Sequence, residues 1–149
     1  MDNKRLVLEG EISVPYKWTL GEAMGRFFTE LRDNRRIIGL RCPRCKKVLI
    51  PTQEYCPQCY VKSSDWVELK DTGILQAFTV VEYQPFWRPM DPPYAIGAIR
   101  LEGADTDLIH LVVTQNYRLL RPGIKVKAVW KEKREGSILD IQYFEPLEV

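Results

Sequence analysis

Cys42-Pro43-Arg44-Cys45 and Cys56-Pro57-Gln58-Cys59 form a doubled Cys-x-x-Cys motif with ten residues between its halves. Each half presents two sulfurs on one side of a tight turn, and a hairpin of this length brings the two turns together. Four thiolates in a tetrahedral arrangement suit zinc and leave no coordination position open for water or substrate. The motif therefore predicts one structural zinc ion per chain. Its ligands would be Cys42, Cys45, Cys56 and Cys59.

Two other interpretations of the cysteines stay open. Iron fits the same four-thiolate site, and spacing alone does not separate it from zinc. Redox disulfides are disfavoured, because a thioredoxin-like pair needs one motif at a helix start rather than two in a hairpin. The N-terminal stretch turns acidic at Glu9 after three apolar residues, so it has no signal-peptide core. No apolar run is long enough to cross a membrane. We therefore expect a cytoplasmic protein, where reduced cysteines favour metal binding.

Composition places the chain among folded proteins and limits its partners. The 149 residues include five Phe, four Trp and seven Tyr, which supply apolar area that disordered chains lack. The net charge of +2 is too small for a protein that coats nucleic acid by charge alone. Residues 32–47 nevertheless hold seven basic residues and one acidic residue. This run is either a solvated surface or an anion-binding patch.

An amphipathic helix is expected before the cysteines, over residue 20 to about residue 34. Thr19-Leu20-Gly21-Glu22 matches a capping box. Apolar residues then recur on one helical face. They are Leu20, Ala23, Met24, Phe27, Phe28 and Leu31. Gly21 and Gly25 lower the helix propensity, so the stripe needs tertiary or partner contacts, and both core packing and partner binding stay open.

The part after the cysteines has an all-β pattern. Short apolar runs at 37–40, 48–50 and 66–69 surround the motif. After Asp71-Thr72-Gly73, five strands are expected, and five short strands within about 75 residues predict a small barrel or sandwich. Their ranges are 74–83, 94–101, 108–114, 125–131 and 138–144.

No convincing catalytic set can be assembled. The single histidine, His110, lies in an apolar strand, where a residue on the outer or edge face is the ordinary interpretation. Nucleophile elbows, Walker loops and dinucleotide-binding glycine motifs are missing from the sequence. The aromatic and proline-rich segment 82–94 is too apolar for an idle loop. It could form a ligand wall, a docking surface or a lid over the barrel.

The order of these parts resembles one family. The resemblance rests on four stretches of sequence. They are the cysteine ribbon, the strand Gly73-Ile74-Leu75-Gln76-Ala77-Phe78-Thr79-Val80-Val81, the segment Pro93-Tyr94-Ala95-Ile96-Gly97 and the turn Pro122-Gly123-Ile124-Lys125-Val126. Over roughly residues 16–145 the chain resembles the zinc-ribbon plus OB-fold family associated with acyl-CoA metabolism, known as domain of unknown function thirty-five. The resemblance implies a mainly β protein with an N-terminal amphipathic helix, a rubredoxin-like zinc ribbon and a five-stranded OB-fold barrel. The expected units are an N-terminal helical segment (1–36), the ribbon (37–70) and the OB-fold domain (71–149).

The resemblance also implies a function. Family members look like non-catalytic partners of thiolase-superfamily enzymes, and in archaea they are similar to the scaffold that links acetoacetyl-CoA thiolase to hydroxymethylglutaryl-CoA synthase. Such a role implies contact with acyl-CoA near the junction of ribbon and barrel. Candidate contacts to the phosphates and adenine of CoA are Arg41, Arg44, Lys46, Lys47, Phe86, Trp87 and Tyr94. Candidate contacts to the enzyme are Leu20, Met24, Phe27, Phe28 and Leu31. Lys46 departs from the family pattern, because many members carry Gly after the second cysteine.

Two rival functions differ in class. A single-stranded nucleic-acid-binding module is possible for a ribbon joined to an OB-fold barrel, although the charge balance makes nucleic acid a poor partner. An independent CoA-dependent enzyme lacks a nucleophile or base. We therefore expect a non-enzymatic accessory subunit of lipid or isoprenoid metabolism, with no membrane contact.

Overall fold

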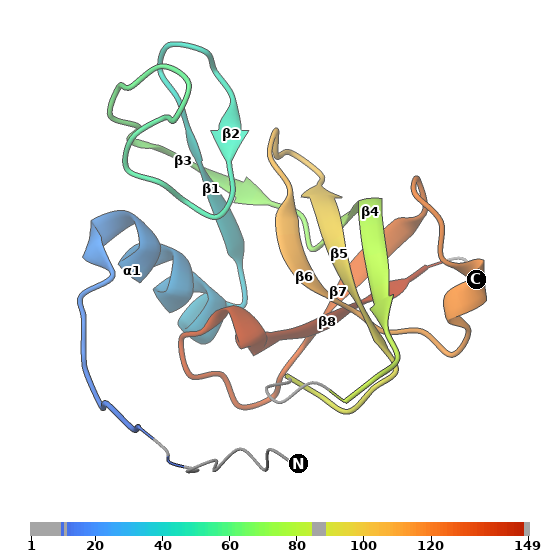
Figure 1. Ribbon diagram of the computed structural model, residues 1–149. Helices are drawn as coiled ribbons and strands as arrows, with labels where there is room; N and C mark the ends of the chain where they lie inside the picture. The colour runs from blue at the N-terminus through green and yellow to red at the C-terminus, as the bar shows by residue number, and fades with distance from the viewer. Residues whose placement is uncertain (1–9, 11, 85–88, 148–149) are drawn as a thin grey trace, which may run out of the picture.

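The computed structural model describes residues 10, 12–84 and 89–147. Within them the chain forms an N-terminal helix, a three-stranded sheet and a closed five-stranded barrel (Figure 1). The four cysteines cluster at the end of the three-stranded sheet that lies away from the barrel. The predicted fold class is confirmed: a mainly β protein with one N-terminal helix and a barrel.

The helix begins and ends differently from the prediction. α1 spans Gly21–Thr29 and continues as one π-helical turn, Glu30–Asn34. The predicted capping box is wrong, because Leu20 stands at the N-cap and no side chain caps the helix. Gly21 has φ +71°, which turns the chain between Thr19 and Glu22. Thr19 instead accepts a hydrogen bond from the Gly21 N–H at 3.3 Å.

The ribbon sheet has the order β2–β1–β3, with both pairs antiparallel. β1 (Ile37–Arg41) is the central strand, and β2 (Val48–Leu49) and β3 (Asp65–Leu69) are the edges. Four of the five β1 residues are buried, which explains the unbroken apolar run in the sequence. The loops between these strands carry the two cysteine pairs.

The barrel closes in the order β4–β5–β6–β8–β7. The parallel contact between β6 and β8 completes it, with Val112 opposite Phe144. The strands are β4 (Thr72–Val81), β5 (Tyr94–Leu101), β6 (Leu108–Val112), β7 (Lys125–Trp130) and β8 (Ile141–Pro146).

The last strand starts later than predicted. Residues Ile138–Asp140 form a 3-10 turn before β8. The buried Asp140 carboxylate accepts hydrogen bonds from the backbone N–H groups of Glu135, Gly136 and Ser137. Another short 3-10 turn, Tyr117–Leu119, lies between β6 and β7. A turn held by local hydrogen bonds from the backbone to the Asp140 side chain thus takes the place of the first part of the expected strand.

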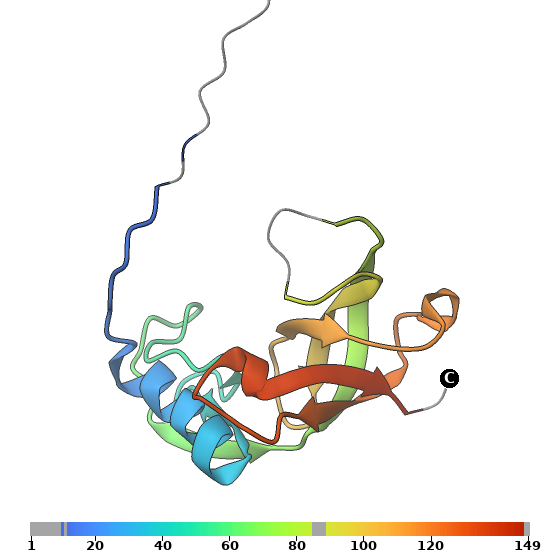
Figure 2. The ribbon, with the colours of Figure 1, turned by 90° about the horizontal axis from the view of Figure 1, so that it is seen from below.

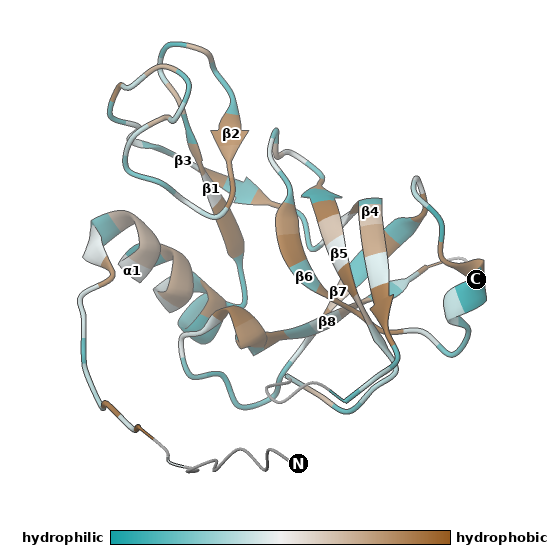
Figure 3. Ribbon diagram, in the orientation of Figure 1, coloured by the Kyte–Doolittle hydropathy of each residue, from teal (hydrophilic) through white to brown (hydrophobic). Residues whose placement is uncertain are grey.

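One hydrophobic core joins helix, ribbon base and barrel. Phe27 and Leu31 from the helix and Ile37 from β1 belong to the same buried cluster as the barrel residues Leu75 and Phe144. In Figure 2 the helix and its π turn lie beside the 3-10 turn that precedes β8, and Figure 3 shows hydrophobic residues in the helix, in β1 and in the barrel strands. The buried part of the helical stripe, which includes Phe27 and Leu31, therefore packs in the core of the chain itself.

The β5–β6 turn fastens the ribbon to the barrel. The Asp105 carboxylate accepts from the Val48 N–H at 2.8 Å, and the Asp105 N–H donates to the Val48 carbonyl at 2.9 Å. Thr106 Oγ1 accepts from the Ile50 N–H at 2.8 Å and donates to the Ile50 carbonyl at 2.9 Å. Edge strand β2 is thus paired by a turn of the barrel as well as by β1.

Candidate metal centre and ligand cleft

The four cysteines form a metal-binding geometry. Their Sγ atoms all lie within 4.8 Å of one another, and Cys45 Sγ lies 3.8 Å from Cys56 Sγ. A tetrahedral site with Zn–S bonds of about 2.3 Å has sulfur–sulfur edges of about 3.8 Å. All four thiols are free, so none is committed to a disulfide. The donor set therefore fits a metal ion such as zinc.

Two equivalent turns position the sulfurs. The Lys46 N–H donates to the Cys42 carbonyl at 3.0 Å, and the Tyr60 N–H donates to the Cys56 carbonyl at 2.9 Å. The backbone N–H of each leading cysteine then bonds to a carbonyl five residues later, that of Lys47 or Val61. We call these turns the knuckles, residues 42–47 and 56–61. Each knuckle places both of its sulfurs on the same side of the chain.

Each knuckle contains one residue in the left-handed region. Lys46 has φ +64° and Tyr60 has φ +55°. This conformation favours glycine, because a Cβ there approaches the following carbonyl oxygen. It is also the position at which Lys46 departs from the family pattern, and the structure shows that lysine is accommodated there.

The thiols of Cys42 and Cys59 differ in acidity. Burial opposes ionisation of the Cys42 thiol, but hydrogen bonds from the backbone N–H groups of Cys45 and Arg44 and from the thiols of Cys45 and Cys56 together lower the pKa of Cys42 to about 6. Burial and the neighbouring sulfurs raise the pKa of Cys59 to about 12. A cation that binds all four sulfurs must therefore displace protons, and its affinity rises with pH.

Some side chains of the predicted basic patch have hydrogen-bonding partners within the chain, and others do not. Arg41 is paired with Asp65 at 2.9 Å across β1 and β3. Lys47 Nζ donates to Gln58 Oε1 at 3.1 Å and so joins the two knuckles. Arg44 and Lys46 are exposed, and no carboxylate among the described residues pairs with either.

Of the three aromatic residues predicted to contact CoA, the described structure includes Tyr94. Tyr94 is only 3% exposed, so its ring offers almost no surface on which an adenine could stack, and this expectation is corrected. Alternation along β5 points Ala95, Ile99 and Leu101 into the core, so Tyr94 lies on the opposite face of the strand, where it is nevertheless covered. Phe86 and Trp87 lie outside the described residues.

The predicted partner face of the helix is also corrected. Phe27 and Leu31 have no exposed surface and cannot meet a partner. They lie over β1 and the barrel, where tertiary packing takes up the apolar stripe. Leu20 is 44% exposed, and Met24 and Phe28 are partly buried. The stripe is most accessible at the start of the helix, at Leu20.

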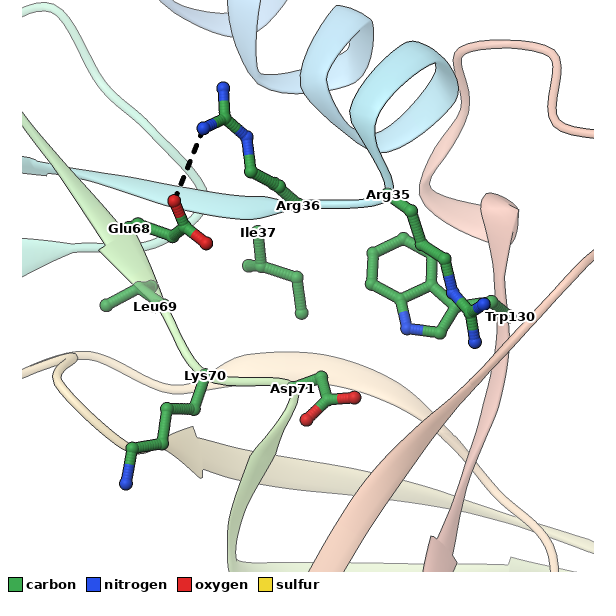
Figure 4. A pocket seen from close by; sticks show the side chains of 8 residues that line it. All are labelled: Arg35, Arg36, Ile37, Glu68, Leu69, Lys70, Asp71 and Trp130. Atoms are coloured by element: carbon green, nitrogen blue, oxygen red, sulfur yellow. Dashed lines mark hydrogen bonds and ion pairs between the residues drawn. The ribbon is translucent and has the colours of Figure 1, made fainter.

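A cleft lies at the junction of ribbon and barrel, where the family resemblance implied contact with acyl-CoA, but none of its lining residues was among the candidates from the sequence. It has a volume of about 500 Å³. Figure 4 shows the Arg35 guanidinium beside Trp130, 5.8 Å from the ring centroid. Arg36 bonds to Glu30 at 2.8 Å and to Glu68 at 3.3 Å. The cleft is lined by Arg35, Arg36, Ile37, Glu68, Leu69, Lys70, Asp71 and Trp130. Arg35 and Arg36 belong to the basic run, but no signal in the sequence places Trp130 beside them.

His110 is a buried residue with both ring nitrogens engaged. It is 5% exposed, so its predicted place on an outer or edge face is wrong. The Leu111 N–H donates to Nδ1 at 2.8 Å, and Nε2 lies 3.0 Å from the Ile138 carbonyl. Since Nδ1 accepts, Nε2 carries the proton and donates to Ile138. Burial lowers the pKa of His110 below its usual 6.5, against the opposing effect of these hydrogen bonds. This histidine is neutral and structural.

Comparison with known proteins identifies the type of barrel. Residues 66–131 match the family model of the ChsH2 C-terminal OB-fold domain. A curated relative from Methanocaldococcus jannaschii, named DUF35 domain-containing scaffold protein, is 27% identical over 128 residues, which cover 83% of this chain and 90% of the relative. The resemblance to the DUF35 family is confirmed.

Two solved structures resemble the chain. A DUF35-family protein of unknown function from Sulfolobus solfataricus is 27% identical, with a TM-score of 0.60 over 73% of this chain and 78% of that one. A chain of the structure described as Ltp2-ChsH2(DUF35) aldolase has a TM-score of 0.64 over 89% of this chain and 100% of that one. At 23% identity, this second likeness shows the fold alone. No helix of the described DUF35-like chain is both long and apolar enough to span a membrane.

Proposed function

We propose that this protein is a non-catalytic accessory subunit that binds a thiolase-superfamily enzyme and its acyl-CoA. The observation that carries the proposal is the likeness to a DUF35 scaffold protein over 83% of the chain. The engaged nitrogens of His110 support it, because they leave the one histidine no free atom for acid–base chemistry. The three expected units, residues 1–36, 37–70 and 71–149, remain part of this proposal.

The metal we propose is zinc, in a structural role. Four sulfurs fill a tetrahedral shell, so no position is left for a reacting group. A four-thiolate centre also requires reduced cysteines, which supports a cytoplasmic location. Iron in the same site would be a different outcome of metal analysis.

Two surfaces are candidates for the phosphate groups of CoA. The first is formed by the exposed, positively charged side chains of Arg44, Lys46 and Lys47 in the first knuckle. The second is the junction cleft, where Arg35 lies beside Trp130 and could meet a phosphate while the indole meets a flat ring. Both involve Arg residues within reach of solvent, and neither requires a change in the fold.

The test is a side-by-side titration at physiological ionic strength. The purified protein is titrated with a thiolase-superfamily enzyme from the same genome, with and without CoA, and with single-stranded DNA and RNA oligonucleotides. We expect binding to the enzyme and weak, salt-sensitive binding to oligonucleotides. Tight oligonucleotide binding without any response to the enzyme or CoA would assign the protein to the nucleic-acid module instead.

Paired variants separate the two surfaces. Arg44→Glu with Lys47→Glu tests the knuckles, and Arg35→Glu tests the cleft. The variant that removes phosphate contacts should weaken CoA binding and make the remainder less salt-sensitive. Arg118→Glu is the matched control, because Arg118 is exposed on the 3-10 turn between β6 and β7 and lines neither surface.

A further inference from the structure

The segment before the helix exposes an alternating apolar series. We call residues 12–20 the arm. Ile12 is 91% exposed, Val14 67%, Tyr16 73% and Trp18 69%. These residues are spaced by two, which places their side chains on one face of an extended chain. The Tyr16 and Trp18 rings lie 5.2 Å apart, as neighbours on such a face. Isolated exposed apolar residues are ordinary, but a continuous series marks an interaction site.

The arm has no partner within the described chain. In Figures 1 and 2 it runs away from the helix and the barrel. Among the described residues, no backbone hydrogen bond joins residues 12–20 to the body. The bond from the Gly21 N–H to Thr19 Oγ1 only fixes the point at which the arm meets α1. The backbone groups and the apolar face of the arm are therefore both available to another molecule.

Pro15 determines which edge of the arm can form a β ladder. In an extended chain, the N–H and C=O groups of successive residues point to opposite edges. Residues 13, 15, 17 and 19 share one edge, and Pro15 has no N–H to donate there. Val14, Tyr16 and Trp18 share the other edge, which is complete. The arm can therefore pair on one side only, as a terminal strand does.

We propose that the arm adds as an edge strand to an unpaired β-sheet edge of the enzyme partner. Val14, Tyr16 and Trp18 would form the ladder with their backbone groups and place their side chains on an apolar surface beside that edge. This inference rests on the proposed accessory function and names the segment that makes the contact.

The arm's own chemistry favours a protein partner. Lys17 is the only charged residue in the arm, so the arm lacks the basic charge that nucleic acids or acidic membranes attract. A second copy of this chain offers no suitable edge in its described part. The barrel is closed, β2 has two residues, and edge strand β3 exposes Asp65 and Glu68.

The contact surface continues from the arm onto the body. Leu20, the last residue of the arm, lines a groove at the start of α1 together with Met24 and Pro51, and Glu22 and Glu54 add polar groups to its wall. A strand-paired arm would bring this groove against the same partner. The accessible margin of the helical stripe, Leu20 and Met24, therefore belongs to the same interface.

Proline substitution tests the pairing edge directly. The full chain and its variants are titrated with the thiolase-superfamily enzyme that binds in the titration above. Tyr16→Pro removes an N–H from the complete edge and should weaken binding about thirtyfold or more. Lys17→Pro, the matched control, removes an N–H from the edge already broken by Pro15 and should change affinity less than twofold. Trp18→Ala should weaken binding as Tyr16→Pro does.

Residue-resolved amide exchange gives a second measurement. On binding, the amides of Val14, Tyr16 and Trp18 should be protected, and those of Ser13, Lys17 and Thr19 should stay exchangeable. Unchanged affinity of Tyr16→Pro and Trp18→Ala would overturn the arm's role while the accessory function stands. Protection that grows with the concentration of the free chain would assign the arm to a second copy. Failure of the unmodified chain to bind any such enzyme would overturn both proposals.

Discussion

Lys46 and Tyr60 occupy a backbone conformation that non-glycine residues rarely adopt. The left-handed region costs a residue with a Cβ about 1–2 kcal/mol, and glycine avoids this cost. Glycine also loses more conformational freedom on folding, which offsets about 0.5–1 kcal/mol of the gain. Lys46→Gly and Tyr60→Gly should therefore each favour the folded knuckle by up to about 1 kcal/mol. Competition with a chelator should show metal affinity raised by up to about fivefold. Arg44→Gly, in the same knuckle without a positive φ, should lower the affinity.

His110 predicts a pH effect on stability with a definite sign. Its pKa in the folded chain lies below 6.5, because burial disfavours the charged ring. The unfolded chain therefore binds a proton that the native chain does not, and the free energy of unfolding falls as pH drops below about 6.5. Guanidinium unfolding at pH 8 and pH 5 should show a larger loss for the unmodified protein than for His110→Gln.

The same variant tests the structural role of His110 in the complex. His110→Gln should leave the rate of the bound enzyme within a small factor. A loss on the order of a hundredfold would show that this ring acts as a general base.

At the scale of elements, α1 has a core face and an accessible margin. Phe27 fills the core between helix, β1 and barrel with no exposed surface. Phe27→Ala should lower the free energy of unfolding by about 3–5 kcal/mol. Leu20→Ala removes a side chain that is 44% exposed, and should change stability by no more than about 0.5 kcal/mol. Denaturant unfolding measures both, and equal losses would contradict this division of the helix.

Metal removal tests whether the knuckles can lose their structure while the barrel stays folded. Cys42, Cys56 and Leu49 form a small cluster of their own, whereas the base of the ribbon shares the main core with the barrel. Metal analysis should find about one equivalent of zinc. Chelation, or Cys56→Ser, should raise amide exchange in the knuckles, 42–47 and 56–61, while β4 to β8 stay protected. Barrel exchange that rises equally, or a Cys42–Cys45 disulfide in reduced protein, would contradict this.

The sequence by itself determined the features that local pattern controls. The doubled Cys-x-x-Cys motif predicts the cysteine cluster because four ligands and two tight turns are encoded within 18 residues. Alternation predicted the barrel strands, since a half-buried strand repeats every two residues. It also predicted the apolar face of the helix, but not its first turn, where the positive φ of Gly21 displaced the expected cap.

Tertiary structure alone decided what lies against each of these faces. Whether Phe27 meets a partner or the core depends on β1 and the barrel, which follow it in the chain. The meeting of Arg35 with Trp130 joins residues 95 positions apart by number, and no local spacing encodes it. The buried place of His110 likewise depends on closure of the barrel. Periodicity identifies a face, but only the packed chain shows whether that face is covered.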